Sequence, residues 1–300
     1  MSKVIAGYRC LTAMQTTGSG SARWCFASRG QERYFLKEFL SPVYPADSHS
    51  ALGSRQLERC RRFETRKQQL YAAASCVIGD TLTPVIDFFR EDGHYYAVSE
   101  AVPEGFASAA DAAELNDDEK RALLYETALC LQRLHRQGIV HADLKPEHVL
   151  FRKAGSGFSV KLIDLDSGFL EQDPPVKEQE IEGDPAYLAP EAFLRMAGVE
   201  TQLTCALDTF AFGALVHVIW TGKLPGFDCE RWRYLYEASL DGADIRLKLP
   251  KEWHSAVSGM LSADPLKRPS DAEITALFAP DAPRAEKACT LNGLRRLMKA

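Results

Sequence analysis

The sequence lacks the features that mark several large classes of protein. Its eight cysteines include no C-x-x-C pair, so neither a zinc site nor a disulfide framework is indicated, and a reducing cytoplasm is the expected location. The N-terminus lacks the apolar segment of a signal peptide, and the most apolar stretch, residues 209–220, is too short to span a bilayer. We therefore expect no integral membrane segment and interpret residues 209–220 as a buried core helix.

The chain also lacks a large excess of charge of either sign. It has 41 acidic and 36 basic side chains, which give a formal net charge of −5 at pH 7. This balance provides no bulk attraction for nucleic acid or for an anionic membrane, so nucleic acid is not an expected partner. No internal repeat is present, and 46% of the residues are hydrophobic, which is enough to fill ordinary protein cores.

The first third of the chain has the pattern of a sheet with one helix. Residues 8–39 alternate apolar and polar side chains around two glycines, which predicts strands joined by a glycine turn. Residues 41–54 are rich in Pro, Ser and Gly and indicate a loop, and a charged helix is expected over 55–74. Two short strands are expected at 84–89 and 94–100.

The rest of the chain indicates helices. Residues 116–138 begin with acidic side chains, have apolar residues at helical spacing and end in Gly, and further helices are expected near Pro190, Leu203 and Lys251. A β-rich start joined to a helical remainder predicts an α+β protein of two lobes with a cleft between them. The expected N-lobe, C-lobe and tail cover residues 1–102, 103–278 and 279–300.

Three motifs follow the helix of 116–138 in order. They are HADLKPEHVL at 141–150, SVKLIDLDSG at 159–168 and GDPAYLAPE at 183–191. In this order they resemble the catalytic loop, the metal-binding motif and the end of the activation segment of eukaryotic-like protein kinases. The resemblance covers roughly residues 8–278 and implies the bilobal protein kinase fold. The short loops resemble those of bacterial members of this family.

The resemblance implies that ATP binds in the cleft. Lys37 matches the lysine that holds the nucleotide's phosphates. The turn before it matches the start of the glycine-rich loop and consists of Gly18, Ser19 and Gly20. Arg23 stands at the place of the third glycine, so the predicted loop is incomplete.

The remaining nucleotide contacts follow from the same resemblance. Lys37 is expected to be held by a glutamate of the predicted helix over 55–74, with Glu64 as the first choice and Glu58 as the alternative. The backbone groups of Glu100 and Val102 are expected to bind the adenine. Ser99, which precedes them, matches the residue at the back of the pocket.

The HADLKPE motif implies the residues that transfer the phosphate. Asp143 matches the catalytic aspartate that accepts the proton of the substrate hydroxyl or orients it, and Lys145 matches the lysine that neutralises the transferred phosphate. By resemblance, Lys145 in DLKPE favours Ser or Thr acceptors in a protein substrate. Asp184 replaces the usual Thr near these residues, and its carboxylate is a candidate acceptor for Lys145.

The implied metal site departs from the family pattern. Asp164 is the expected principal ligand of Mg²⁺ or Mn²⁺. His148 replaces an asparagine, and because an imidazole suits softer metals than an amide oxygen does, activity is expected to shift toward Mn²⁺ or to fall. Asp166 replaces a glycine and has two open interpretations, a second metal ligand or a cap of the turn that follows.

The resemblance to protein kinases extends to the activation segment and the C-lobe. Ala142 replaces the arginine that receives an activation-loop phosphate, and Ser167 is the only hydroxyl residue between Asp164 and Gly183. We therefore predict an activation segment set by packing and fixed acidic residues. The family's buried ion pair and the aspartate that steadies the catalytic loop match Glu191, Arg268 and Asp208.

Two other functions stay open. A pseudokinase would bind nucleotide and be stabilised by it without transferring phosphate, and its signature is the set of departures at Arg23, His148 and Asp166. A kinase-fold enzyme acting on a small molecule is disfavoured by the intact motif at 183–191. A regulatory partner could bind the loop over 41–54 or the tail, which has the pattern of an amphipathic helix.

Overall fold

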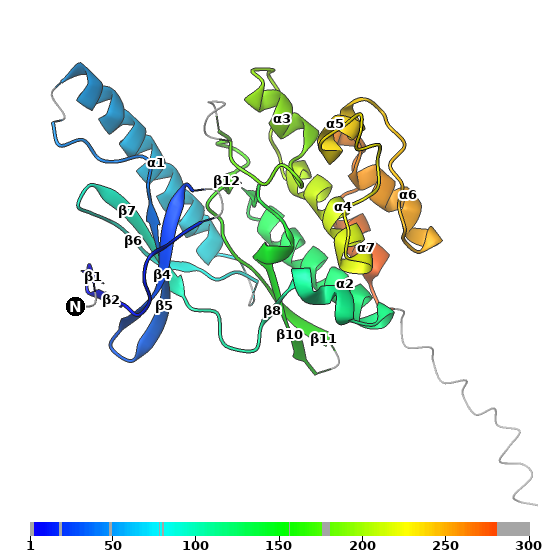
Figure 1. Ribbon diagram of the computed structural model, residues 1–300, viewed down its shortest axis with the longest axis horizontal. Helices are drawn as coiled ribbons and strands as arrows, with labels where there is room; N and C mark the ends of the chain where they lie inside the picture. The colour runs from blue at the N-terminus through cyan, green and yellow to red at the C-terminus, as the bar shows by residue number, and fades with distance from the viewer. Residues whose placement is uncertain are drawn as a thin grey trace, which may run out of the picture.

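The structure is a computed structural model. It confirms the predicted α+β fold of two lobes (Figure 1). It describes residues 3–17, 20–47, 50–77, 79, 81–155, 157–175 and 181–280. Gly18 and Ser19 of the predicted glycine turn, and the tail over 281–300, lie outside the described residues. Figure 1 shows the strands and helix α1 of the first part of the chain on one side and the helical part on the other.

The N-terminal lobe is built on one antiparallel sheet. Its strands are β1 (Val4–Ile5), β2 (Tyr8–Cys10), β3 (Gln15–Thr16), β4 (Ala22–Arg29), β5 (Glu32–Phe39), β6 (Val85–Glu91) and β7 (His94–Glu100). They lie in the order β1-β2-β4-β5-β7-β6, and β3 pairs with β4. The predicted β6–β7 hairpin is confirmed, and Asp92 and Gly93 form its turn with positive φ at both positions, as tight hairpin turns favour.

Helix α1 (Ala51–Ser75) completes this lobe and begins at Ala51, earlier than the predicted start at residue 55. Ser50 caps the helix, because its side-chain oxygen accepts a hydrogen bond from the backbone N–H of Gly53 at 3.0 Å. A Cβ at Gly53 would lie 1.8 Å from the carbonyl oxygen of Asp47. Glycine at this position therefore lets the preceding loop pack on the first turn of α1, and that loop ends at Ser50.

The C-terminal lobe is mostly helical, as predicted. Its helices are α2 (Asp117–His135), α3 (Pro190–Met196), α4 (Ala206–Thr221), α5 (Leu235–Leu240), α6 (Lys251–Met260) and α7 (Asp271–Phe278), with short 3-10 helices η1 (Ala109–Glu114), η2 (Pro146–His148) and η4 (Pro265–Lys267). A capping box of Asn116 and Glu119 begins α2. Most of α4 is buried, so the apolar stretch at 209–220 is the predicted core helix. Within the described ranges, no helix is long and apolar enough to cross a membrane.

Two small sheets bring the catalytic and metal motifs together. One consists of β8 (Ala107–Ser108), β10 (Val149–Ala154) and β11 (Gly157–Leu162), and the other pairs β9 (Ile139–Val140) with β12 (Phe169–Leu170). The segment 141–148 connects β9 to β10, and the segment 163–168 connects β11 to β12. Since β10 pairs with β11 and β9 with β12, the two segments lie side by side, and the backbone N–H of Ile163 donates to the carbonyl of His148 at 3.0 Å.

Candidate active site

Asp208, in the first turn of α4, fixes the backbone of the HADLKPE loop. Its carboxylate is 1% exposed and accepts hydrogen bonds from the backbone N–H of His141 at 2.7 Å and of Ala142 at 2.9 Å. Ala142 has a φ of 63°, a conformation that costs energy for a residue with a Cβ and persists where the surroundings enforce it. The predicted role of Asp208 in holding this loop is confirmed.

His135, at the C-terminal end of α2, connects Asp208 to the last helix. Its Nε2 lies 3.0 Å from Asp208 Oδ2, and its Nδ1 lies 2.9 Å from Asp271 Oδ1. Burial alone would lower the pKa of His135, but the hydrogen bonds to Asp208 and Asp271 outweigh burial and raise the pKa to about 9. The imidazolium therefore links α2, α4 and α7 beneath the catalytic loop.

Asp143 and Lys145 lie together, as the motif implies. Lys145 Nζ is 3.0 Å from Asp143 Oδ2, and the other carboxylate oxygen of Asp143 accepts a hydrogen bond from the backbone N–H of Asp184 at 2.8 Å. The side chain of Asp184 also forms an ion pair with Lys145, with 3.9 Å between Oδ2 and Nζ. Asp184 thus supplies a backbone donor and a carboxylate at the place where the family has a threonine hydroxyl.

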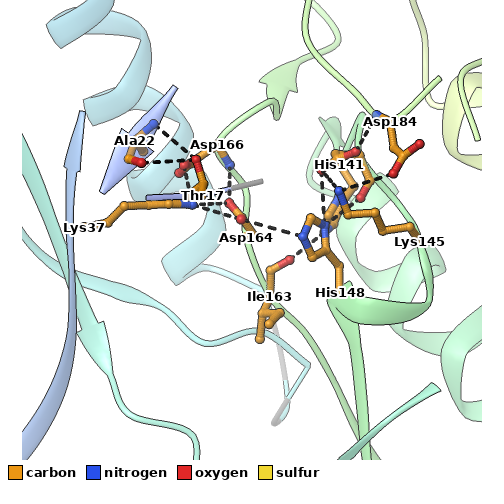
Figure 2. Close-up of polar contacts among 11 residues, drawn as sticks. Thr17, Ala22, Lys37, His141, Lys145, His148, Ile163, Asp164, Asp166 and Asp184 are labelled. Atoms are coloured by element: carbon orange, nitrogen blue, oxygen red, sulfur yellow. Dashed lines mark hydrogen bonds and ion pairs between the residues drawn. The ribbon is translucent and has the colours of Figure 1, made fainter. Parts of the chain in front are cut away.

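His148 faces Asp164 with a free lone pair. Its Nδ1 lies 2.8 Å from the carbonyl oxygen of Asp143, and because a carbonyl only accepts, Nδ1 carries the proton. Burial lowers the pKa of His148, so the ring is neutral and Nε2 is unprotonated. Nε2 lies 3.7 Å from Asp164 Oδ2 (Figure 2). Two electron-rich atoms therefore face one another, an arrangement that suits a cation between them.

Asp164 begins the loop after β11 and reaches across the cleft. Its φ of 66° is unusual for a residue other than glycine. Both of its carboxylate oxygens lie 2.9 Å from Lys37 Nζ on β5. Burial would raise the pKa of Asp164, but the positive charge of Lys37 and its hydrogen bonds to the carboxylate outweigh burial and lower the pKa to about 2. Asp164 is consequently ionised at neutral pH.

The predicted ion pair between Lys37 and Glu64 is wrong in this structure. Lys37 pairs instead with Asp164 and with Asp166, whose Oδ2 lies 2.5 Å from Nζ (Figure 2). Glu64 accepts a hydrogen bond from the hydroxyl of Tyr95 at 3.3 Å. Glu58, the alternative, is 76% exposed and lies 3.9 Å from Arg62. The register of α1 is the reason, because neither glutamate lies at the helix position that faces the metal motif.

That helix position belongs to Lys67, which sequence reasoning missed. Lys67 is 7% exposed and donates a hydrogen bond to the backbone carbonyl of Asp166 at 2.5 Å. Burial lowers the pKa of Lys67. A signal was present in the sequence, because Lys67 falls on the same helical stripe as the buried residues Cys60, Leu70 and Ala74. A lysine on an apolar stripe is rarely buried unless it is paired.

Asp166 makes a contact that neither interpretation from the sequence included. Its carboxylate contacts Lys37, and the turn is capped instead by Asp164, whose Oδ1 accepts from the backbone N–H of Asp166 at 3.3 Å. The structure favours the contact with Lys37, and a metal-ligand role for Asp166 stays a prediction.

Arg23 does not enter the cleft. Its guanidinium lies 2.7 Å from Glu38 Oε1 on the neighbouring strand, and Glu38 is 1% exposed. Because side chains alternate along a strand, Glu38 and its neighbour Lys37 point to opposite faces of the sheet. Arg23 therefore lies away from the face of the sheet that carries Lys37. Trp24, which pairs with Lys37, lies on the Lys37 face.

The cleft has an apolar part and a charged part. The apolar part has about 1080 Å³ of empty space, part of it open to solvent, and its lining includes Phe26, Phe35, Ser99, Glu100 and Val102. The charged part has about 1300 Å³ of empty space, also partly open to solvent, and is lined by Thr17, Lys37, Asp143, Lys145, His148, Asp164, Asp166 and Asp184, among others. Such a combination suits a ligand with a flat apolar end and an anionic end.

Comparison with known proteins identifies the family. The model of the protein kinase domain matches residues 68–278. The chain belongs to the protein kinase family. Its relatives include the hormonally up-regulated neu tumor-associated kinase homolog B of Xenopus laevis, at 30% identity over 203 residues, which are 63% of this chain and 30% of the relative.

Other relatives are of the same kind. The human hormonally up-regulated neu tumor-associated kinase is 29% identical over 199 residues, or 63% of this chain and 26% of the relative. A probable myosin light chain kinase of Dictyostelium discoideum is 28% identical over 189 residues, or 61% of this chain and 59% of the relative. The chain thus spans less than a third of the length of the first two relatives.

The kinase's buried ion pair in the C-terminal lobe is confirmed. The guanidinium of Arg268 lies 2.6 and 2.7 Å from the two carboxylate oxygens of Glu191, and both side chains are almost fully buried. Arg268 also donates to the carbonyls of Ala206 and Ser262. This network joins the segment at 183–191 to the helices below it.

The kinase's charged cleft fits a divalent cation shared with phosphate oxygens. Within the described residues, no group of three or more His, Cys, Asp or Glu side chains is arranged to hold a metal alone. Mg²⁺ in nucleotide sites uses one or two protein ligands together with phosphates and water. His148 Nε2 and Asp164 Oδ2 lie 3.7 Å apart and are the two atoms that would hold such a cation, one of them a nitrogen.

Proposed function

We propose that this kinase transfers the γ-phosphate of ATP to Ser or Thr hydroxyls of a protein substrate. The proposal rests chiefly on the convergence of Lys37, Asp143, Lys145 and Asp164 on one charged cleft. Their contacts, 2.9 Å for Lys37 with Asp164 and 3.0 Å for Lys145 with Asp143, place two cations and two carboxylates around one volume. Positioning and charge neutralisation of this kind are what phosphoryl transfer requires from a protein.

The apolar part of the cleft is the proposed adenine site. The face of the base would lie against Phe26 and Phe35, and its edge against backbone groups of Glu100 and Val102. The phosphates would extend toward Lys37, beside Thr17 and Ser21, which flank the predicted glycine turn. The small side chain of Ser99 leaves the back of this site open.

Transfer is proposed to begin at Asp143. Its carboxylate orients the Ser or Thr hydroxyl of the substrate and accepts its proton as the hydroxyl oxygen bonds to the γ-phosphorus. The bond between that phosphorus and the bridging oxygen breaks, and ADP leaves. Lys145, held by Asp143 and Asp184, compensates charge on the phosphoryl group during this step.

The proposed cofactor besides ATP is Mg²⁺ or Mn²⁺, held by Asp164 and His148. When bound, it neutralises the phosphates' negative charge. A nitrogen ligand favours Mn²⁺ over Mg²⁺, because Mg²⁺ strongly prefers oxygen. We therefore propose that the enzyme prefers Mn²⁺.

The activation segment is proposed to be held by permanent contacts and not by phosphorylation. Asp173 lies 3.2 Å from Arg66 of α1, and Glu171 accepts from the backbone N–H of Cys205 at 3.0 Å before α4. These acidic side chains connect the segment to both lobes. Two other acidic residues of the segment, Glu178 and Glu180, lie outside the described residues.

The second candidate is a pseudokinase, and it is favoured by the departures at His148 and Asp166. Such a protein would bind nucleotide as a binding module. We prefer the enzyme, because the four residues that phosphoryl transfer requires are all present, namely Lys37, Asp143, Lys145 and Asp164. A small-molecule kinase is disfavoured by the buried Glu191–Arg268 pair, which supports a peptide-binding segment in the family.

The location and partners of the kinase remain proposals from the sequence. We propose a cytoplasmic protein that acts on protein substrates and does not bind nucleic acid. A regulatory partner is proposed to bind the loop before α1 or the C-terminal tail.

Transfer of labelled phosphate from ATP tests the proposal. Wild type and Asp143→Asn are compared in Mg²⁺ and in Mn²⁺, with the protein itself and a generic basic protein as acceptors. We expect label with the wild type, stronger in Mn²⁺, and its loss in the variant. If ATP raises the melting temperature while no label is transferred in either metal, the pseudokinase replaces the enzyme.

A further inference from the structure

Three groups of alternating charge connect helix α1 to the nucleotide cleft. Lys37 Nζ on β5 lies 2.5 Å from the carboxylate of Asp166, and the backbone carbonyl of the same Asp166 lies 2.5 Å from Lys67 Nζ on α1. Asp166 thus contacts one lysine with its side chain and the other with its main chain. Figure 2 shows Asp166 directed to Lys37 beside Asp164.

The surroundings of Lys67 favour its contact with the backbone carbonyl of Asp166. Among the residues of α1, Lys67 is the one buried residue with a charged side chain. Its ammonium lies 5.5, 5.8 and 5.9 Å from the ring centres of Phe39, Phe63 and Tyr71. These rings stabilise a cation but accept no conventional hydrogen bond, so the carbonyl of Asp166 is an important acceptor for the buried ammonium.

Lys37 has a related dependence on Asp166. Its ion pairs within the described residues are with Asp164 and Asp166. Asp164 is also a predicted metal ligand, so its carboxylate is shared when a metal binds. Glu64 is occupied by Tyr95. Asp166 is then the carboxylate left to hold Lys37 in position for the phosphates.

We propose that Asp166 and Lys67 are positioning residues that together replace a helix glutamate. Asp166 holds the ammonium of Lys37 toward the phosphates, and Lys67 holds the Asp166 loop through its backbone carbonyl. The position of α1 is thereby coupled to the nucleotide site by a lysine of the helix. The inference rests on the proposed use of ATP and adds a means by which α1 controls ATP binding.

The arrangement suggests a charge-exchange experiment. Lys67→Glu places a carboxylate beside Asp166, and Asp166→Gly removes the anchor of Lys37 and leaves two lysines as neighbours. The double variant presents a helix glutamate to Lys37 with no competing carboxylate at residue 166. The matched control is Arg61→Glu, the same change of charge at an exposed residue of α1.

Affinity for ATP is measured at saturating Mn²⁺, when Asp164 is shared with the metal and Asp166 is the carboxylate left to hold Lys37, and the Mn²⁺ concentration required is determined for each variant. We expect each single variant to weaken binding about tenfold, the double variant to return within about threefold of wild type, and the control to stay within about twofold. Asp166→Asn, which keeps the shape of the side chain, is expected to behave as Asp166→Gly. The melting temperature without nucleotide is expected to show the same rescue in the double variant.

Additive losses in the double variant would overturn the inference. So would unchanged ATP affinity of Asp166→Asn at saturating Mn²⁺ together with a raised Mn²⁺ requirement, because Asp166 would then be a metal ligand only. The proposed function fails separately: a wild type that binds ATP and shows the rescue but transfers no phosphate contradicts the enzyme and supports the positioning role. If the wild type transfers phosphate but the double variant shows no rescue, the enzyme is supported and the positioning role of Asp166 and Lys67 is contradicted.

Discussion

The two lobes differ in how they form the contacts that the kinase motifs imply. In the C-terminal lobe, Asp208 holds the catalytic loop and Glu191 pairs with Arg268, as the sequence predicts. In the N-terminal lobe, Lys37 is held by Asp166, and no glutamate of α1 contacts it. The family match begins at residue 68, directly after Lys67. The C-terminal lobe thus follows the family pattern, while the N-terminal lobe forms its side of the charged cleft with other residues.

The difference shows where a kinase tolerates change. Asp208 and Arg268 are buried and bind backbone groups as well as side chains, so a substitution there leaves several partners unsatisfied. In the proposed arrangement, Lys37 needs only a negative charge at the correct place. A carboxylate from the metal loop can supply that charge in place of one from a helix.

The largest expected effect is in the C-terminal lobe. Arg268→Ala leaves the Glu191 carboxylate buried without its partner, so we expect the free energy of unfolding to fall by about 3–5 kcal/mol in urea titrations. Lys267→Ala is the control, because this neighbour is 74% exposed, and a change within about 0.5 kcal/mol is expected. A small loss in Arg268→Ala would contradict the assignment of this lobe as the rigid part.

The next largest effect is the pH dependence that His135 gives the C-terminal lobe. Its pKa rises from 6.5 to about 9 on folding, so its stabilisation is complete below pH 6.5 and is lost as the pH rises to about 9. The shift corresponds to about 3 kcal/mol. We expect the difference in unfolding free energy between wild type and His135→Gln to shrink over that range. A difference that is constant with pH would show that His135 is neutral.

A smaller effect is expected at the junction of the lobes. His148→Asn restores an oxygen ligand, and we expect the ratio of Mg²⁺-supported to Mn²⁺-supported transfer to rise about tenfold. His254→Asn is the control, because His254 contacts the carbonyl of Leu249. An unchanged ratio would remove His148 from the metal site.

The smallest effect is expected at Glu64 in the N-terminal lobe. Glu64→Gln keeps an acceptor for Tyr95, so we expect ATP affinity within about twofold of wild type and a loss of stability of no more than about 1 kcal/mol. The measurements are calorimetric titration and urea unfolding. A tenfold loss of affinity would show that Glu64 holds Lys37 when ATP is bound, and the two lobes would then follow one pattern.

The sequence was sufficient for contacts that depend on short spacing. Asp143 and Lys145 share one loop, and Asp208 begins a well-defined core helix, so their places follow from the motifs. The helix register of α1 was not predictable in the same way. The loop before it has no fixed length in the family pattern, and Gly53 lets that loop pack so that the helix begins at Ala51. Lys67 consequently takes the position expected for Glu64.

The type of residue that receives the phosphate distinguishes a Ser/Thr protein kinase from a pseudokinase. A protein substrate is incubated with wild type and labelled ATP, hydrolysed, and separated into its phosphoamino acids, with Asp143→Asn in parallel. We expect labelled phosphoserine or phosphothreonine with the wild type and neither with the variant. Binding of ATP with no labelled phosphoamino acid, or equal label with Asp143→Asn, would contradict it.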